Sequence, residues 1–433
     1  MGKNLKKNKR GKTIGVVGLG YVGLPLALLA DKKGYEVIGV DINQEKVDKL
    51  KKKTPLFEDV KVEKLIKESG FKVTTDFAAL KTASVIVICV PTPVNKKHLP
   101  DLVPLEEVSK ALGLILQRGQ LVVLESTVNP GVSEGVVLPF LQKNSGLIGG
   151  KDFYLAHCPE RINPGDPFWD VENIPRVIGS LEEVGLARAT DFYRSILKAE
   201  VKQMDSLKEA EAVKVVENSF RDINIAFVNE LAMSFSKLGI DVVNVLNGAA
   251  TKPFAFMRHL PGCGVGGHCI PVDPYYLIKY AKENGFNHNF LKLARKINNY
   301  MPEFTTKLLI EGLRKKKIEV VGARVTVLGL AYKPNVDDCR ESPAFKIIDN
   351  LKKQGIIVSV FDPHVLNRST SPSLDKSLAG SQAVMVATGH RAFSGLTPEF
   401  LKSHGISVVV DGRNFLPKES FNNSGLVYLG IGR

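Results

Sequence analysis

The stretch from Thr13 to Asn43 constrains the fold of this chain more than any other part of its sequence. It reads TIGVVGLGYVGLPLALLADKKGYEVIGVDIN: an apolar strand, a glycine turn, a helix of small and apolar residues that ends at Gly34, and a second strand that finishes at Asp41. A strand, a crossover helix and a second strand form a βαβ unit with parallel strands. The chain is therefore expected to begin with a doubly wound α/β domain.

The turn of this unit carries the glycine pattern of dinucleotide-binding proteins. In Gly18-x-Gly20-x-x-Gly23, the first glycine permits a tight turn, the second lets the backbone approach a pyrophosphate, and the third lets the helix pack on the strand. Asp41 is placed to accept hydrogen bonds from the adenosine ribose, and its charge repels the 2′-phosphate of NADP. With no arginine directly beyond it, NAD is the expected cofactor, bound by Gly18, Gly20, Tyr21, Val22, Gly23 and Asp41.

Later segments extend this pattern along the chain. SVIVICVPTP (84–93) and LVVLESTVNPG (121–131) are apolar strands closed by turns with proline or glycine. Continuous apolar strands that alternate with helices are typical of a parallel sheet covered on both faces. A long helical pattern then runs from Ser206 to Leu238, with Ser206 and Glu209 at capping-box spacing and Gly239 at its end. Such a helix, about 50 Å long from its rise per residue, is expected to join domains or to form a dimer seam.

The last third of the chain repeats the opening. Residues 323–364 again read as strand, glycine turn, helix, glycine and strand, with Asp362 where Asp41 stood. The glycine pattern is broken, however, because Leu330 follows Gly329 and Lys333 with its proline replaces the last glycine. This second α/β domain is therefore expected to bind something other than a dinucleotide pyrophosphate.

Length and charge narrow the class of protein. A chain of 433 residues is expected to form two or three domains. No apolar run reaches the roughly 18 residues of a membrane span, and there is no apolar signal core, so a cytoplasmic protein is expected. The net charge is +14, and six of the positive charges lie in an N-terminal tail: Lys3, Lys6, Lys7, Lys9, Arg10 and Lys12. We interpret this tail as solvated, and the remaining charge favours small phosphate-bearing substrates over nucleic acid.

The expected architecture is α/β, with two doubly wound Rossmann-like domains joined by a long central helix and a helical middle region. The expected ranges are a basic tail (1–12), an N-terminal NAD-binding domain (13–204), a central helical dimerisation region with a cysteine loop (205–305) and a C-terminal Rossmann-like domain (306–433).

The stretch GVGGHCIPVDP (264–274) places a cysteine in a glycine-rich loop. Five scattered cysteines without C-x-x-C spacing predict thiols, with neither disulfides nor a zinc site. Cys89 lies inside an apolar strand and Cys263 has no polar companions, so both are interpreted as structural. Cys269, between His268 and Asp273, is approachable and is a candidate nucleophile, with a small buried thiol as the alternative.

A cysteine beside an NAD domain indicates a particular chemistry. A thiol that adds to an aldehyde gives a thiohemiacetal, which can lose a second hydride and become a thioester, and water then releases an acid. Oxidation of a primary alcohol to a carboxylate fits these residues better than a simple dehydrogenation. Lys214 and Asn218, four apart on the long helix, share a face, but alone they fit a solvated polar stripe equally well.

Ordered blocks from about Lys12 to the C-terminus resemble the UDP-glucose/GDP-mannose dehydrogenase family. The blocks are GLGYVGLPLA, VPTP, ESTVNPG, HCPERINPGD, EAVKVVENSFRDINIAFVNELA, GVGGHCIPVDPYYL and GLAYKPNVDDCRESPA. The resemblance implies that Cys269 forms the covalent intermediates, that Lys214 and Asn218 stabilise developing oxyanion charge, and that Asp273 places water or the lysine. Glu160 would assist thioester hydrolysis, whereas Pro164 stands where some members carry a second glutamate.

The resemblance implies further contacts. Thr92 and Thr127 lie in blocks expected beside the cofactor, with Thr127 near the nicotinamide. The C-terminal domain would bind the UDP portion of a UDP-sugar through Lys333 and Arg340, and Gly266 would lie against the substrate. Dimers would form through the central helices, and Arg258 would reach the substrate of the partner subunit.

Substrate choice is also inferred from resemblance. The loop GGHCIPVDPYYL is similar to that of members that act on UDP-N-acetylhexosamines, whereas UDP-glucose members carry a GGSCFPKD-like loop with lysine where Val272 stands here. ATKPFAFM and YKPNVDDCRESPA favour UDP-N-acetylglucosamine over UDP-N-acetylmannosamine, the alternative epimer, and over other sugars such as UDP-glucose.

Two other functions fit parts of the sequence. A two-electron dehydrogenase of the 3-hydroxyacid type shares the N-terminal domain, the long helix and a lysine, but leaves Cys269 and the C-terminal domain without a role. A nucleotide-sugar-binding protein without turnover would not need Cys269, Lys214, Asn218 and Glu160 together.

Overall fold

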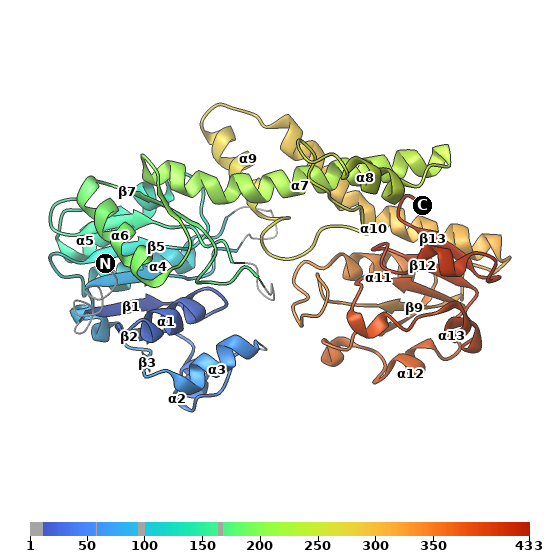
Figure 1. Cartoon of the computed structure of the whole chain (residues 1–433), viewed down its shortest axis with the longest axis horizontal. Coiled ribbons are helices and arrows are strands. Elements are labelled where there is room, and N and C mark those ends of the chain that lie inside the picture. The colour runs from blue at the N-terminus through green and yellow to red at the C-terminus, as the bar shows by residue number, and fades with distance from the viewer. Residues whose placement is uncertain (1–11, 58, 94–99, 163–167) are drawn as a thin grey trace. The chain divides into compact units, whose positions relative to one another are not determined.

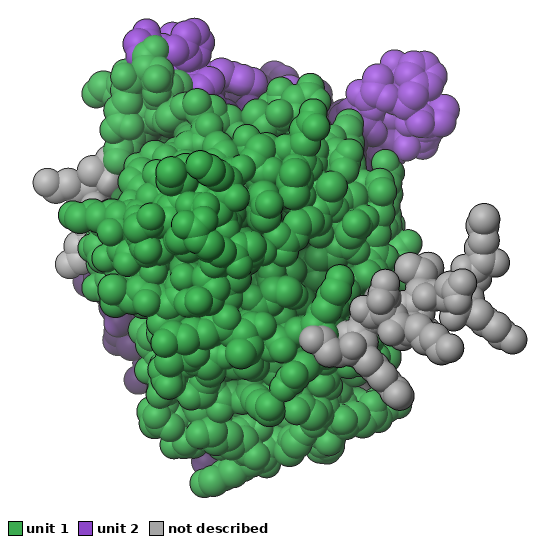
Figure 2. All heavy atoms as spheres, turned by 90° about the vertical axis from the view of Figure 1, so that its left-hand side faces the viewer, with its two compact units in different colours: residues 1–217, 275–284 green, residues 218–274, 285–433 purple. Residues whose placement is uncertain are grey.

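The computed structural model describes residues 12–57, 59–93, 100–162 and 168–433 (Figure 1). The basic tail up to Gly11 and Pro164 lie outside the described residues. The chain forms two compact units, coloured separately in Figure 2. Unit 1 comprises Met1–Glu217 and Tyr275–Asn284, and unit 2 comprises Asn218–Pro274 and Gly285–Arg433. Each described helix is too short or too polar to cross a membrane.

Unit 1 is built on a sheet whose described strands follow the order β3-β2-β1-β4-β5-β6-β7-β8. All neighbouring strands are parallel except β6 and β7, whose antiparallel pairing departs from the predicted parallel sheet. The strands are β1 (Thr13–Val17), β2 (Glu36–Val40), β3 (Lys72–Thr74), β4 (Val85–Ile88), β5 (Leu121–Leu124), β6 (Tyr154–His157), β7 (Arg176–Ser180) and β8 (Val201–Gln203).

Both faces of this sheet are buried, as the apolar strands predict. In β4, Val85 and Val87 join one core cluster, and Ile86 and Ile88 join the other. Alternate side chains of a strand point to opposite faces, so a wholly apolar strand needs cover on both sides. The α-helices wholly within unit 1 are α1 (Gly23–Lys32), α2 (Gln44–Lys51), α3 (Val60–Glu68), α4 (Val103–Gly113), α5 (Leu138–Ser145) and α6 (Glu183–Ile196). Most of α9 (Asp273–Glu283) also belongs to this unit.

Unit 2 contains a parallel sheet of strand order β10-β9-β11-β12-β13 and a helical part. The strands are β9 (Arg324–Leu328), β10 (Ile357–Phe361), β11 (Ala383–Val386), β12 (Val408–Asp411) and β13 (Val427–Gly430). The helices are α8 (Val242–Ala249), α10 (Asn289–Lys315), α11 (Pro343–Lys353), α12 (Leu374–Leu378) and α13 (Pro398–Ser403). Helix α10 continues through residue 305, where the predicted central region ends.

The predicted long helix is α7 (Leu207–Leu238), which belongs to unit 1 up to Glu217 and to unit 2 from Asn218. Its start is capped as predicted, because the Ser206 hydroxyl accepts the Glu209 backbone N–H at 3.2 Å. It ends at Gly239, which adopts a positive φ of 69°.

The second βαβ unit also forms, with one difference from the sequence prediction. Helix α11 does not follow the glycine turn after β9 directly; it begins at Pro343, and residues 329–342 form a long connection. Ser342 caps the helix by accepting the Ala344 N–H at 3.3 Å, and proline occupies the first helical turn. This connection supplies the contacts to the cysteine loop described below.

Candidate active site

The glycine turn of unit 1 combines two structural glycines with one that leaves open space. Gly18 has a φ of 91° and donates its N–H to Val40 O at 2.8 Å. A Cβ on Gly23 would lie 1.9 Å from Gly18 O, so the helix could not approach the strand with any other residue there. A Cβ on Gly20 would meet no described atom within 4 Å. The turn therefore leaves room above Gly20, as a bound pyrophosphate requires.

Asp41 lies directly after β2 and is fixed by backbone donors. Its carboxylate accepts the N–H groups of Leu19 and Asn43, each at 2.9 Å, and Lys46 lies 3.6 Å from it. Tyr21, in the turn, stacks on Phe57 with ring centroids 4.3 Å apart. Val22 is the residue that precedes α1. The residues present therefore fit an NAD site, with its acid ordered before a ligand binds.

Thr92 and Thr127 are brought together at the same edge of the sheet. The Thr92 hydroxyl donates to Thr127 O at 2.6 Å, and the Tyr276 hydroxyl donates to Thr92 O. These residues follow β4 and β5, while the glycine turn follows β1 and Asp41 follows β2. Ligands of doubly wound sheets bind at the carboxyl ends of the strands, where the strand order reverses; here the reversal lies between β1 and β4.

Glu160 and Lys214, two of the predicted site residues, interact electrostatically in unit 1. Burial raises the pKa of the Glu160 carboxyl to about 7, against the opposing effect of the Lys214 ammonium and the Arg176 guanidinium. The carboxylate accepts the Ile162 N–H. Lys214 is only 8% exposed on α7, so it is not part of a solvated stripe. A carboxyl group with a pKa near 7 can exchange a proton at neutral pH.

Sequence reasoning missed a buried ionic cluster below Glu160. Arg176 and Glu125 are both fully buried, with 3.8 Å between Nη1 and Oε2, and the Tyr193 hydroxyl donates to Glu125 at 2.5 Å. This cluster holds the segment that carries Glu160, since the Glu160 N–H donates to Glu125 O at 3.3 Å and Arg176 Nη1 donates to Pro159 O at 3.4 Å. The available signal was an acid at the end of the apolar strand LVVLE.

Glu211 was also missed. Its buried carboxylate, on α7, accepts the backbone N–H groups of Gly131 at 2.5 Å and Ser133 at 2.8 Å. It therefore ties the start of α7, with Lys214 one turn later, to the loop that follows Thr127. The glutamate could not be singled out in a helix rich in charged residues.

In unit 2, the structure brings Cys269, Asp273 and Asn218 together. Cys269 is partly exposed, and its carbonyl accepts the N–H groups of Val272 at 3.0 Å and Asp273 at 2.8 Å. Asp273, the first residue of α9 (Asp273–Glu283), is 3% exposed, and Asn218 Nδ2 donates to its Oδ2 at 2.5 Å. The other cysteines interpreted as structural, Cys89 and Cys263, are buried, and burial raises the pKa of both thiols.

The glycines before Cys269 pack against the protein itself. Gly264 and Gly267 have φ of 133° and 87°. A Cβ on Gly266 would lie 2.9 Å from Glu341 O, and one on Gly267 would lie 3.0 Å from the Tyr332 ring. The glycine run thus has a structural cause that the sequence did not reveal: the loop lies closely against the connection between β9 and α11.

The same connection carries the residues expected to hold UDP. Gly267 N–H donates to Arg340 O at 3.0 Å, and the Arg340 guanidinium binds Asp338 with Nη2 2.6 Å from Oδ2. The ammonium of Lys333 lies 6.0 Å from the Tyr332 ring centroid. Arg258 is exposed in the loop between α8 and α9, and is not among the residues that these contacts join.

Arg413 is a further residue that sequence reasoning missed. Its Nε donates to Ala387 O at 2.9 Å and its Nη1 donates to Gly264 O at 3.1 Å, while Cys263 N–H donates to Gly412 O at 2.8 Å. The buried Nη2 of Arg413 has no hydrogen-bond partner among the described residues. The end of β12 thus holds the cysteine loop and presents a cation beside it.

At the carboxyl end of β10 in the second sheet, hydrogen bonds within the protein occupy the Asp362 carboxylate. Asp362 accepts the N–H groups of Leu330 at 2.5 Å and Ala331 at 2.9 Å, and His390 Nε2 lies 3.0 Å from it. Both side chains are fully buried. Burial alone would raise the pKa of Asp362, but these hydrogen bonds outweigh it and lower the pKa to about 2.

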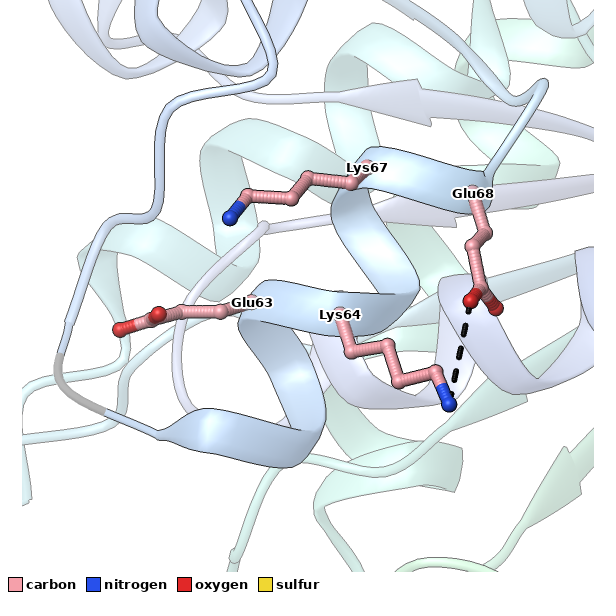
Figure 3. A pocket seen from close by; sticks show the side chains of 4 residues that line it. All are labelled: Glu63, Lys64, Lys67 and Glu68. Carbon is pink, nitrogen blue, oxygen red and sulfur yellow. Dashed lines mark ion pairs between the residues drawn. The ribbon is translucent and has the colours of Figure 1, made fainter.

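A surface hollow elsewhere in unit 1 offers no comparable chemistry. Its lining residues, Glu63, Lys64, Lys67 and Glu68, all project from α3, and Lys64 pairs with Glu68 at 4.0 Å (Figure 3). Two of the four side chains are acidic and two are basic, and they give the hollow neither a nucleophile nor a deep cavity. Among the described residues, no group of three or more His, Cys, Asp or Glu side chains is placed to hold a metal ion.

Comparison with known proteins places this geometry in a family. Residues 12–197 match the NAD binding domain of the UDP-glucose/GDP-mannose dehydrogenase family, residues 208–300 its central domain and residues 326–418 its UDP binding domain. A UDP-N-acetyl-D-mannosamine dehydrogenase from Pyrococcus horikoshii is 38% identical over 97% of this chain and 99% of its own. A UDP-N-acetyl-D-glucosamine 6-dehydrogenase from Pseudomonas aeruginosa is 38% identical over 90% of this chain and 94% of its own.

The fold agrees with these matches. A solved structure of a UDP-D-ManNAc dehydrogenase from Pyrococcus horikoshii superposes with a TM-score of 0.91 at 37% identity, covering 97% of this chain and 99% of that one. The matched domains, the ordered NAD edge of unit 1 and the cysteine cluster of unit 2 support the same assignment. The chain belongs to the UDP-glucose/GDP-mannose dehydrogenase family.

Proposed function

We propose that this chain is an NAD-dependent 6-dehydrogenase that oxidises the C6 hydroxymethyl group of a UDP-N-acetylhexosamine to a carboxylate. The observation that carries the proposal is the cluster in unit 2, where a partly exposed Cys269 precedes a buried Asp273 that Asn218 holds in place. A thiol in such a loop supplies a covalent route from aldehyde to acid, and a two-electron alcohol dehydrogenase has no use for it. The relatives named above act on UDP-N-acetylhexosamines.

The proposed reaction runs through two oxidations at one carbon. NAD supplies the hydride acceptor for each, so two NADH form per sugar. The C6 alcohol first loses a hydride and a proton to give an aldehyde, and the Cys269 thiolate adds to it to form a thiohemiacetal. Loss of a second hydride gives a thioester, and water cleaves the C–S bond to release the carboxylate and the thiol.

The remaining residues are assigned supporting roles. Lys214 and Asn218 stabilise the negative charge that develops on oxygen at C6. Asp273 orients water or the lysine. Glu160 takes a proton from the water that attacks the thioester, and the pKa of about 7 that burial gives it suits a general base at neutral pH. Thr127 lies near the nicotinamide.

The C-terminal domain is proposed to bind the UDP portion. Lys333 and Arg340 supply the cations for the diphosphate, and Gly266 lies where the loop meets the substrate. We favour the N-acetylglucosamine epimer on the resemblance of ATKPFAFM and YKPNVDDCRESPA. N-acetylmannosamine is the alternative, because the relatives include enzymes for both sugars. Val272, which stands where UDP-glucose enzymes carry lysine, is 6% exposed and can pack against an apolar group only.

A homodimer completes the proposal. In unit 2, Phe220 and Phe227 are 46% and 52% exposed and lie seven apart on α7, so they share a face; Phe254 and Met257 are 67% and 63% exposed. Exposed aromatic side chains grouped on one helix indicate a protein interface. We propose that a second copy of this chain covers this face, and that the nearby Arg258 reaches the partner's substrate. Light scattering of the protein in solution tests this by measuring its mass.

A cytoplasmic location follows from the chemistry. The proposed nucleophile acts only as a thiol, and the cytoplasm keeps thiols reduced.

The proposal is tested with purified protein, NAD and a panel of UDP-hexoses and UDP-N-acetylhexosamines. NADH absorbance and product mass should show two NADH and one uronic acid per sugar nucleotide, with the highest kcat/KM for a UDP-N-acetylhexosamine. Cys269→Ala should lose acid formation by at least about 1000-fold while it still binds the UDP-sugar. One NADH with a stable aldehyde, or no turnover with any sugar, would contradict the proposal.

A further inference from the structure

Three polar side chains line one face of α7 within unit 2. Asn218, Asp222 and Asn229 follow each other at intervals of four and seven residues. Eleven residues correspond to three helical turns at about 3.6 residues per turn, so the first and the last lie on the same face. Their side chains are 6%, 1% and 0% exposed. Buried polar groups at this spacing require partners, and the partners show what the face does.

Asn229 binds the chain two residues before the cysteine loop (264–274). Its Oδ1 accepts the backbone N–H of Gly262 at 2.9 Å, and its Nδ2 donates to Asn298 Oδ1 at 2.9 Å. Because the Gly262 N–H can only donate, the amide has one possible orientation. The side chain therefore links the loop to helix α10.

A buried network behind Asn229 fixes that amide. Asn298 Nδ2 donates to both the backbone carbonyl and the carboxylate of Asp222, at 2.9 Å and 2.8 Å. Arg295 Nη1 donates to the same carboxylate at 2.5 Å. Rotation of the Asn229 amide would break this chain of donors and acceptors, and broken hydrogen bonds in a buried site are costly.

The two asparagines of α7 hold opposite ends of the cysteine loop. Asn229 binds Gly262, which precedes Cys269, and Asn218 binds Asp273, which follows it. Between these points, Gly264 O accepts a hydrogen bond from Arg413 and the Gly267 N–H donates to Arg340 O. One rigid helix thus sets the separation and direction of both loop ends.

We propose that Asn229 is a positioning residue for catalysis, which fixes the start of the cysteine loop so that the Cys269 thiol meets C6 in the reactive geometry. This inference rests on the proposed function of Cys269. Asn229 acts through Gly262 and touches no reacting atom. Its loss is expected to lower kcat by up to about 100-fold, because misplacement of a reactive group by about 1 Å costs this much. KM for the UDP-sugar should change far less.

The experiment compares Asn229→Leu with Asn224→Leu in the full-length enzyme. Asn224 lies on the same helix but donates only to the Phe220 carbonyl one turn earlier, at 2.6 Å, so it is a matched control. Three quantities are measured: kcat and KM with the preferred UDP-sugar, the thermal unfolding midpoint, and the rate at which iodoacetamide alkylates Cys269 and Cys263, read by peptide mass spectrometry.

The expected result is a fall in kcat with little change in KM for Asn229→Leu, faster alkylation of Cys269 in a loop released at one end, and no alkylation of the buried Cys263. Kinetics equal to those of Asn224→Leu would overturn the inference. A fall in kcat together with a comparable rise in KM and alkylation of Cys263 would also overturn it, because these changes indicate general loosening of unit 2. If Asn229→Leu does not fold, Asn229→Ser is judged by the same criteria.

The test separates this inference from the proposed function. A wild-type enzyme without acid formation contradicts the proposed function, whereas an active wild type with an unaffected Asn229→Leu variant contradicts only the positioning role.

Discussion

The two Rossmann-like sheets share a turn and differ in what the turn leaves open. Gly18 and Gly329 have φ of 91° and 92°, and their N–H groups donate to Val40 O and Phe361 O at 2.8 Å and 2.9 Å. In both, the next residue donates its N–H to an acid after the second strand, Asp41 or Asp362. The glycine and the acid therefore build the turn itself, whether or not a dinucleotide binds.

The difference lies one residue further on. Gly20 in the first turn corresponds to Ala331 in the second, whose N–H donates to Asp362, a carboxylate that also pairs with the buried His390. Helix α1 begins at Gly23, close to the strand end, whereas α11 begins only at Pro343. A pyrophosphate needs an open backbone at the turn and a helix N-terminus nearby. The second turn offers neither, because the Ala331 N–H is bonded to Asp362 and α11 begins only at Pro343.

The largest effect expected from this comparison follows from Gly20→Val. A side chain at Gly20 meets no described protein atom, so the thermal unfolding midpoint should stay near that of wild type. NAD affinity should fall by roughly 10- to 100-fold, because the added atoms occupy the space of the pyrophosphate. Isothermal titration calorimetry with NAD measures this. Ala331→Gly is the matched control, and an unchanged NAD affinity in Gly20→Val would break the comparison.

A smaller effect is expected from the paired variants Asp41→Asn and Asp362→Asn. The first should weaken NAD binding about tenfold, through loss of a charged acceptor for the ribose. The second should leave NAD binding intact and lower the free energy of unfolding of unit 2 by about 2 kcal/mol. Since the pKa of Asp362 is lowered to about 2, this stabilisation is present above the ordinary carboxyl pKa and is lost as the pH falls through about 2.

Chemical denaturation at pH 7 and NAD titration of both variants check this pair. Equal effects of the two substitutions on NAD affinity would show that the second acid also serves a dinucleotide.

The smallest effect concerns pH. Glu160 follows β6 in unit 1, and burial raises its pKa to about 7, whereas the pKa of Asp362 is lowered. If its ionised form is the base for thioester hydrolysis, acid formation should fall by about half between pH 8 and pH 7 and further at lower pH. Single-turnover rates from pH 5.5 to 8.5 measure this. A profile that Glu160→Gln leaves unchanged in shape would exclude the glutamate as the titrating base.

Much of the fold could be predicted from the sequence, because strand, turn and helix signals are local. The structure confirms three predicted features: the glycine turn, the capped start of α7 and the second βαβ unit. They were predicted from hydrophobic periodicity and from glycine, proline and capping residues. The antiparallel β7 and the late start of α11 were not predicted, because pairing direction and loop path depend on distant contacts.

Some residues of the candidate site could likewise be predicted from the sequence, and others could not. Cys269, Asp273 and Asn218 could be singled out, and their contact required only that the helix and the loop meet. Arg176, Glu125, Glu211 and Arg413 could not, because their roles arise from burial and from backbone partners far away in sequence. The close packing of Gly266 and Gly267 against residues 332–341 gave the glycine run a cause that no local pattern carries.

The three-turn interval between Asn218 and Asn229 also limits how this enzyme can be recombined with its relatives. A chimera joined inside α7 keeps both loop anchors only when the residue count between them is preserved. Each inserted or deleted residue rotates everything beyond it by about 100° around the helix axis and shifts it by about 1.5 Å. Substitutions that keep the length of this segment should leave both loop anchors in register, while a change in its length by one residue should abolish turnover without removing any proposed catalytic group.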